Sequence, residues 1–213
     1  MKFAMSYSCG KDSAFALYKM KQAGHEPVCF IVAFNEKAGR SWFHGAQEQL
    51  LNKVAQALEL PLITARSSSE DYEQEFEKAL HQAKELGAQC AAFGDIDIEG
   101  HRQWNQVRCN TAGLECALPL WGVPRAEVVR EMLDAGFVAH IKSVDKKYLD
   151  ESFLGEALND AIIRRIAATG ADVCGENGEY HTFVSEGPIF RHPVQIELGE
   201  VIDLDTHAVI DIK

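Results

Sequence analysis

Six residues close to the N-terminus, Ser8-Cys9-Gly10-Lys11-Asp12-Ser13, have the side chains and spacing of a phosphate-binding turn. The turn follows a short apolar run, Lys2 to Met5, and precedes Ala14 to Met20, whose apolar residues stand at helical spacing. A helix N-terminus offers unpaired backbone N–H groups and a positive dipole end, so a turn of small residues lets a polyanion approach closely. We therefore expect a phosphate chain as the ligand.

Each residue type in this turn has its own use. Gly10 supplies a permissive backbone, Ser8 and Ser13 supply hydroxyl donors, and Lys11 supplies a point charge. Asp12 cannot bind phosphate directly, so it either caps the helix or holds a Mg²⁺ that bridges phosphate oxygens. An ordinary capped helix after a strand is the competing interpretation. A Walker A loop is excluded, because its first glycine is absent and an aspartate follows the lysine.

A second stretch, Gly175-Glu176-Asn177-Gly178-Glu179-Tyr180-His181-Thr182, is dense in turn formers and ligand-type side chains. Such a density is costly to order unless it binds something. The two glutamates could bind a cationic amine, ammonium or Mg²⁺, His181 could relay a proton, and Thr182 could hydrogen-bond a phosphate or carboxylate. The alternative is a tight hairpin with a type I′ turn at Asn177-Gly178. Both hold if the hairpin presents Glu179 and His181 on one face.

Two other loops are expected near the same site. Ser41-Trp42-Phe43-His44 is either a wall beside the nucleotide, with His44 handling a hydrogen bond or a proton, or a seal of the sheet edge. The segment from Gly94 to Arg102 carries Asp95, Asp97 and Glu99, which lie on one side if the segment is extended. That pattern indicates either a site for a metal or amine or a solvated acidic loop, and spacing alone favours the latter.

Apolar periodicity along the rest of the chain alternates strands with helices. The expected strands are 27–34, 60–64, 90–93, 115–118 and 137–144. The expected helices are 47–58, 72–86, 104–112, 125–135 and 160–169. This alternation predicts an α/β fold with a doubly wound parallel sheet and right-handed crossovers. Alternating residues within 188–213 predict antiparallel strands that complete the second half.

Composition restricts the class of function. The chain has 213 residues, 46% of them hydrophobic, enough for one sizeable domain or two small ones. The net charge of -11 argues against an extensive nucleic-acid surface, because 21 basic residues are outnumbered by 32 acidic ones. No apolar run approaches the ~20 residues of a membrane span, so we expect a cytoplasmic protein. The six cysteines include no Cys-x-x-Cys pair and are expected to be reduced thiols.

The first turn resembles the pyrophosphate loop of ATP pyrophosphatases, with Cys9 in place of the first glycine. The whole chain resembles the diphthine-ammonia ligase family of that superfamily. The resemblance depends on the pyrophosphate loop, Ser41-Trp42-Phe43-His44, Gly94-Asp95-Ile96, Pro119-Leu120-Trp121-Gly122 and the Gly175 to Thr182 stretch. It implies a Rossmann-like, adenine nucleotide hydrolase-like domain, 1–118, that binds ATP over the carboxyl edge of the sheet. It also implies a smaller α+β domain, 119–213, that binds the acceptor.

In such ligases ATP adenylates an acceptor carboxylate and releases pyrophosphate, and ammonia then attacks the acyl adenylate to give an amide and AMP. The resemblance thus implies ATP and Mg²⁺ as cofactors and free ammonia as the nitrogen source. The acceptor it implies is diphthine on elongation factor 2 for an archaeal or eukaryotic source, and another carboxylate for a bacterial one.

The resemblance also implies roles for individual residues. Catalytic roles fall to Lys11, Asp12, Glu176, Glu179 and His181, with Asp12 the candidate Mg²⁺ ligand. Nucleotide binding falls to Ser6, Ser8, Cys9, Gly10, Lys11, Asp12, Ser13, Phe34, His44, Gly94 and Asp95. Acceptor binding falls to Arg102, Trp121, Glu176, Asn177, Gly178, Glu179, Tyr180, His181 and Thr182.

Two other classes of function remain open from the sequence. A tRNA-modifying pyrophosphate-loop enzyme is disfavoured by the acidity of the chain and by the lack of a basic appendage. A non-catalytic adenine nucleotide sensor would share the sheet but would not need Lys11, Asp12 and a glutamate motif. Release of AMP and pyrophosphate separates the sensor from the enzymes. An oligomer is compatible with the sequence, which carries no signal for its size.

Overall fold

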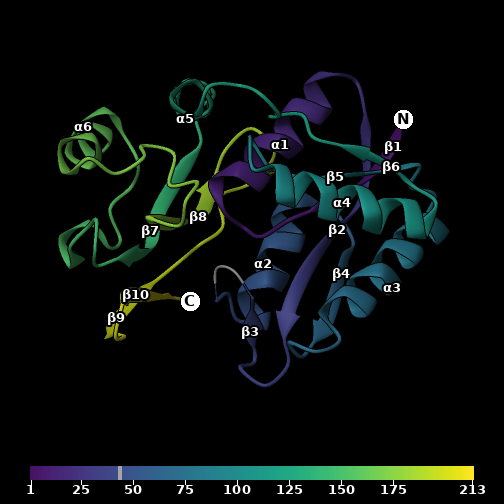
Figure 1. Cartoon of the computed structure of the whole chain (residues 1–213), viewed down its shortest axis with the longest axis horizontal. Helices are drawn as coiled ribbons and strands as arrows, with labels where there is room; N and C mark the ends of the chain where they lie inside the picture. The colour runs from purple at the N-terminus through teal and green to yellow at the C-terminus, as the bar shows by residue number, and fades with distance from the viewer. Residues whose placement is uncertain (43–44) are drawn as a thin grey trace.

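A computed structural model describes residues 1–42 and 45–213, and its first half contains a mostly parallel sheet (Figure 1). The sheet consists of β1 (Lys2–Ser6), β2 (Glu26–Asn35), β4 (Leu62–Ser67), β5 (Cys90–Ala92) and β6 (Glu115–Ala117), with β3 (Arg40–Ser41) antiparallel to the end of β2. Strand β2 has β1 on one side and β4 on the other, because Phe30 and Ile31 each pair with both strands. Strands β5 and β6 continue beyond β1. The order is therefore β4-β2-β1-β5-β6, with all these pairs parallel.

Helices cover both faces of this sheet. They are α1 (Lys11–Gln22), α2 (Glu48–Leu58), α3 (Tyr72–Glu85) and α4 (Glu99–Ala112). Alternate residues of β1 point to opposite faces, so Phe3 and Met5 join a core with α1 and α2, whereas Ala4 joins a core with α3 and α4. The predicted doubly wound α/β fold is confirmed. The strand order reverses between β1 and β5, and open sheets of this kind bind ligands at that crevice.

The second half contains a separate antiparallel sheet, drawn green to yellow in Figure 1. It consists of β7 (Val138–Asp145), β8 (Tyr180–Glu186), β9 (Leu198–Asp203) and β10 (His207–Ile212), in the order β8-β7-β10-β9. The elements beside it are α5 (Arg125–Asp134), the short helix η1 (Glu151–Phe153) and α6 (Asp160–Thr169).

The two halves share a core. One buried cluster runs from Phe3 in β1 to Ile212 in β10, and the ring of Phe15 on α1 lies 6.2 Å from that of Phe137. A division into domains at 118/119 stays a prediction. Among the described residues, no helix has the length and apolar content needed to cross a membrane.

Two predicted boundaries are wrong. Helix α4 begins at Glu99 rather than at Trp104, because Gly100 in its first turn interrupts the apolar spacing without preventing the helix. Glu99 therefore lies in the helix and is not part of one extended segment with Asp95 and Asp97. Strand β4 is Leu62–Ser67 rather than 60–64, because it pairs from end to end with Phe30 to Asn35 of β2.

Candidate active site

The turn after β1 is a compact loop held by its two serines. The Ser13 hydroxyl donates to the Gly10 carbonyl at 2.9 Å, and the Ser8 backbone N–H donates to the Ser13 hydroxyl oxygen at 3.2 Å. Helix α1 begins at Lys11, so the backbone N–H groups of its first turn lack partners within the helix. The amide of Lys11 instead donates to Oγ1 of Thr182 on β8 at 3.0 Å. The loop and the second half of the chain are thus joined at the helix N-terminus.

Cys9 has a left-handed backbone, with φ of 68°. Residues other than glycine rarely adopt this conformation, so the cysteine adds strain at the position where the pyrophosphate-loop pattern has glycine. The strained residue is held by its carbonyl, which accepts from the Val184 amide at 2.9 Å. Its side chain is fully buried, and burial raises the pKa of the thiol to about 12. Cys9 therefore contributes backbone to the loop while its thiol packs in the core.

Gly94 brings the end of β5 against this loop. A Cβ atom at Gly94 would lie 2.7 Å from the Asp12 carbonyl carbon and 2.8 Å from the Ser13 nitrogen. Only glycine allows this approach, which forms the crevice at the reversal of strand order. The next residue, Asp95, accepts from Asn105 Nδ2 at 2.7 Å, and its other oxygen lies 3.0 Å from His101 Nδ1. Asp95 is thereby fixed by α4.

Lys11 and Asp12 form a tight ion pair at the bottom of the site. The Lys11 ammonium donates to both oxygens of Asp12, at 2.8 and 2.7 Å, and lies 5.7 Å from the ring centroid of Tyr180. Burial lowers the pKa of Lys11, but its neighbours, Asp12 foremost, together hold that pKa above its ordinary value. Lys11 is therefore a fixed cation.

Asp12, Cys174 and Glu176 form a group whose ligand atoms all lie within 4.8 Å of one another. Burial, and then the charge of Asp12, raise the pKa of Glu176 to about 7. Burial also raises the pKa of the Cys174 thiol to about 12, so this thiol is protonated. Mg²⁺ prefers carboxylate oxygens to sulfur. The two carboxylates therefore fit a Mg²⁺ that also binds phosphate oxygens, whereas the thiol does not.

The glutamate-rich loop is organised by Glu179, whose side chain is 3% exposed. Its carboxylate accepts from the backbone N–H groups of Asp172 and Asn177, at 3.3 and 3.1 Å, and from Asn177 Nδ2 at 3.1 Å. The alternative interpretation, a tight hairpin at Asn177-Gly178, is wrong: β8 begins at Tyr180 and pairs with β7, and no strand precedes it within 170–179. These hydrogen bonds to Glu179 outweigh the local preference of an Asn-Gly pair. A direct part for Glu179 in chemistry stays untested.

Arg125 on α5 joins this loop to the loop after β5. Its guanidinium donates to both oxygens of Asp97 at 2.7 Å, to Asp172 at 2.6 Å and to Asn177 Oδ1 at 3.2 Å. Hydrogen bonding to Arg125 lowers the pKa of Asp97. No sequence pattern predicts this contact, because Arg125 lies 28 residues from Asp97 and 47 from Asp172 along the chain.

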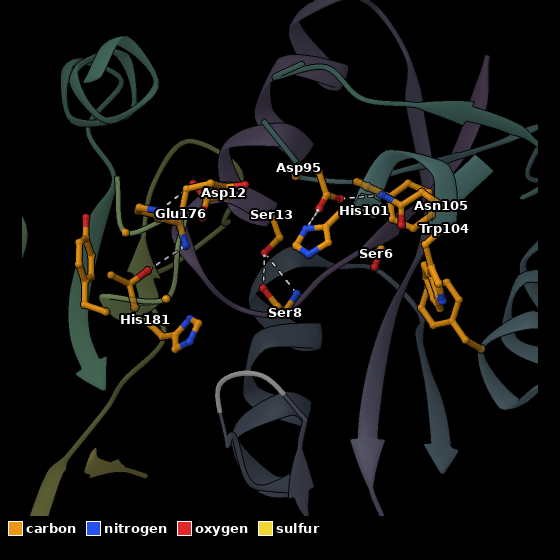
Figure 2. A pocket seen from close by; sticks show the side chains of 18 of the residues that line it. Ser6, Ser8, Asp12, Ser13, Asp95, His101, Trp104, Asn105, Glu176 and His181 are labelled. Atoms are coloured by element: carbon orange, nitrogen blue, oxygen red, sulfur yellow. Dashed lines mark hydrogen bonds and ion pairs between the residues drawn. The ribbon is translucent and has the colours of Figure 1, made fainter. Parts of the chain in front are cut away.

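A cavity of about 340 Å³ lies between these parts of the two halves. In Figure 2, Ser8 and Ser13 lie between Asp12, Glu176 and His181 on one side and Asp95, His101 and Asn105 on the other. The predicted site residues that line the cavity are Ser6, Ser8, Lys11, Asp12, Ser13, Gly94, Asp95, Glu176, Gly178, Tyr180, His181 and Thr182. The structure thus brings together two loops separated by more than half of the chain.

Other residues that line the cavity are not among the predicted site residues. They are Tyr72, Phe76, Phe93, His101, Trp104, Asn105 and Gly175. The aromatic residues among them stand at spacings typical of core positions, so periodicity alone could not separate lining from core. Burial lowers the pKa of His181, so its imidazole is mostly neutral near pH 7.

Several predicted site residues lie elsewhere among the described residues. Phe34 is buried in the core, 4.8 Å from the Arg66 guanidinium. Arg102 lies 5.1 Å from the ring centroid of Trp121, away from the cavity lining. Cys9, Gly10, Asn177 and Glu179 are also absent from that lining. His44 lies outside the described residues.

Comparison with known families gives two matches in tandem. Residues 1–116 match the model of the diphthamide synthase N-terminal domain, and residues 125–213 match that of the diphthamide synthase C-terminal domain. A human protein named diphthine--ammonia ligase is 25% identical over 227 residues, covering 95% of this chain and 85% of that protein. A Danio rerio protein of the same name is 24% identical, covering 92% and 86%. A solved structure from Methanocaldococcus jannaschii, described as a predicted subunit of tRNA methyltransferase, covers 91% of this chain at 14% identity with a TM-score of 0.48.

Proposed function

Because the chain belongs to the diphthamide synthase family, we propose that it is an ATP-dependent amide ligase that releases AMP and pyrophosphate. The observation that carries the proposal is the shared cavity. It is lined on one side by the turn at the start of α1 and on the other by Glu176 and by His181 of β8. A ligase of this kind needs the α-phosphate of ATP and the acceptor carboxylate within reach of each other.

The first step forms a bond between an acceptor carboxylate oxygen and the α-phosphorus, and it breaks the bond from that phosphorus to the bridging oxygen of pyrophosphate. Negative charge grows on the leaving pyrophosphate. In this proposal the first-turn N–H groups of α1 and the ammonium of Lys11 stabilise that charge. Ser8 and Ser13 keep the turn in shape.

A Mg²⁺ fits beside this turn. Asp12 and Glu176 are the residues that would hold it, and its chemistry would be to neutralise charge on phosphate oxygens. The protein's own contribution is to fix Asp12 through Lys11 and to place Glu176 within 4.8 Å of it.

In the second step ammonia attacks the carbonyl carbon of the acyl adenylate, AMP leaves, and the nitrogen must lose a proton. His181 is a suitable acceptor for it, because its imidazole is mostly neutral near pH 7 and lines the cavity. Glu176, with a pKa of about 7, can bind ammonium or take the same proton. Glu179 supports this step indirectly by ordering the loop.

The acceptor we propose is diphthine on elongation factor 2, because the relatives are named diphthine--ammonia ligase. A carboxylate on another molecule is the competing acceptor. Transfer to tRNA is disfavoured by the net charge of -11. We further propose that the N-terminal half, 1–118, binds the nucleotide and that 119–213 binds the acceptor, in a cytoplasmic protein.

The test is turnover of ATP by the purified protein with Mg²⁺ and ammonium, separating AMP plus pyrophosphate from ADP plus phosphate. A diphthine-bearing acceptor protein, its unmodified form and tRNA are added in turn. We expect AMP and pyrophosphate to rise only with the first and to be lost in Lys11→Ala. Lys21→Ala, an exposed lysine in the last turn of the same helix, is the control. Bound but uncleaved ATP with every acceptor would favour a nucleotide sensor, and stimulation by tRNA would overturn the acceptor.

A further inference from the structure

Lys142 is a buried lysine outside the site described above. Its side chain is 1% exposed, and Nζ has no hydrogen-bond partner among the described residues. An unpaired amine in the interior costs stability whether it is charged or neutral. A methionine of similar length would avoid that cost, so the lysine calls for a functional explanation.

Lys142 stands at an irregularity of β7 beside two residues of β8 that line the cavity. The register of β7 against β8 shifts between Ile141 and Ser143, which pair with Thr182 and His181 respectively. Lys142 is therefore the extra residue of a β-bulge, opposite two residues that line the cavity. Bulges redirect side chains and are common beside active sites.

The described groups that face Lys142 give its ammonium no hydrogen bond. They are Cys9 of the phosphate loop, Arg40 of β3 and Asp211 of β10. The Asp211 carboxylate is already bound by Arg40 at 2.9 Å, and the Cys9 thiol is protonated. A Cβ at Gly45 would lie 3.9 Å from Lys142 Cε, so the chain before α2 packs against the aliphatic stem.

We propose that Lys142 is a positioning residue for the polyphosphate of the nucleotide, acting through the loop backbone at Cys9. The inference rests on the proposed function. Lys142 does not line the cavity, so it does not touch the ligand. Its charge raises the potential at the loop from behind, where low dielectric weakens screening. Lys11 alone supplies less positive potential at the loop than its charge suggests, because the Asp12 carboxylate offsets that charge.

If Lys142 has this role, its replacement lowers nucleotide affinity without lowering the stability of the protein. Lys142→Met removes a buried unpaired amine, so we expect the midpoint of thermal unfolding to rise or stay unchanged. The same variant should lower the affinity for ATP about tenfold, lower that for AMP by less and leave that for adenosine unchanged, as expected for a nearby charge acting at reduced dielectric. Lys147→Met is the matched control, because Lys147 is exposed just beyond the same strand.

Calorimetric dissociation constants for ATP, AMP and adenosine test the inference directly. The native protein gives a second measurement, because burial lowers the pKa of Lys142 to about 8, with Asp211 and Cys9 opposing that shift and Arg40 adding to it. Affinity for ATP should fall between pH 7 and pH 9.5 in the native protein and stay flat in Lys142→Met. The pH series on the native protein also tests the inference if Lys142→Met does not fold.

Equal ATP affinity in Lys142→Met and the native protein would overturn the inference, as would an equal loss for ATP and adenosine. Both results leave the proposed function intact, since the native protein would still bind and cleave ATP. Failure of the native protein to bind any adenine nucleotide would instead overturn the proposed function itself.

Discussion

Gly94 gives the sharpest test of how the site is built. A methyl group there would lie 2.7 Å from the Asp12 carbonyl carbon, 2.9 Å from the Asp12 carbonyl oxygen and 2.8 Å from the Ser13 nitrogen. All three are backbone atoms in the first turn of α1, so they cannot rotate away as a side chain would. In Gly94→Ala the end of β5 and the start of α1 must therefore move apart.

The magnitude follows from the cost of overpacking, which is about 1–3 kcal/mol for an inserted methyl or methylene in a packed region. For a chain of this size each kcal/mol shifts the unfolding midpoint by about 2–4 °C, so we expect a fall of roughly 2–12 °C. The functional loss should be larger, because displacement of a catalytic loop by about 1 Å can cost about a hundredfold in rate.

Gly100→Ala is the matched control. Gly100 lies in the first turn of α4, and a Cβ there meets no atom within 4 Å. Replacing glycine by alanine in an exposed helix stabilises by about 0.5–1 kcal/mol, so the two variants should differ in sign. Thermal unfolding and formation of AMP and pyrophosphate are measured for both. Gly94→Ala with native stability and native turnover would refute the account of the crevice.

Three further variants separate roles within the loops. Glu176→Gln should remove a rise in kcat/KM for ATP as the pH passes through about 7, because the native carboxyl group must be ionised to bind a cation; an unchanged pH profile would contradict this. Glu179→Gln turns an acceptor into a donor facing backbone N–H groups, so the free energy of unfolding should fall by about 1–3 kcal/mol; loss of turnover at native stability would instead show a direct part in chemistry. Arg125→Met leaves Asp97 and Asp172 unpaired, so amide hydrogen exchange within 172–178 should become faster while β1 stays protected. Equal protection in the native protein and the variant would argue against a role for Arg125 in holding the two loops together.

Local patterns predicted most of the fold and the centre of the site. Apolar runs without alternation suit strands buried on both faces, which is why β1 and β2 could be placed from the sequence. Parallel strands share a carboxyl edge, so the loop after β1 and Gly94 after β5 were expected to meet there. The observed approach of Gly94 to Asp12 accords with that expectation.

Long-range polar contacts could not be predicted in the same way. Arg125 meets Asp97 and Asp172 because α5 packs beside two loops, and that packing is a property of the whole fold. Glu179 looks like a catalytic acid in the sequence, since residue type does not reveal whether a carboxylate faces a ligand or its own loop. Lys142 did leave a local signal, as a lysine within an apolar strand.

The hydrogen bond from the Lys11 amide to Thr182 joins the phosphate-binding turn to β8. A phosphate placed at the start of α1 would take the same donor, so nucleotide and β8 share one backbone N–H group. β8 also carries His181, and its Val184 amide holds the strained Cys9 carbonyl. Movement of β8 on nucleotide binding would therefore act at once on the loop backbone and on His181, which lines the cavity.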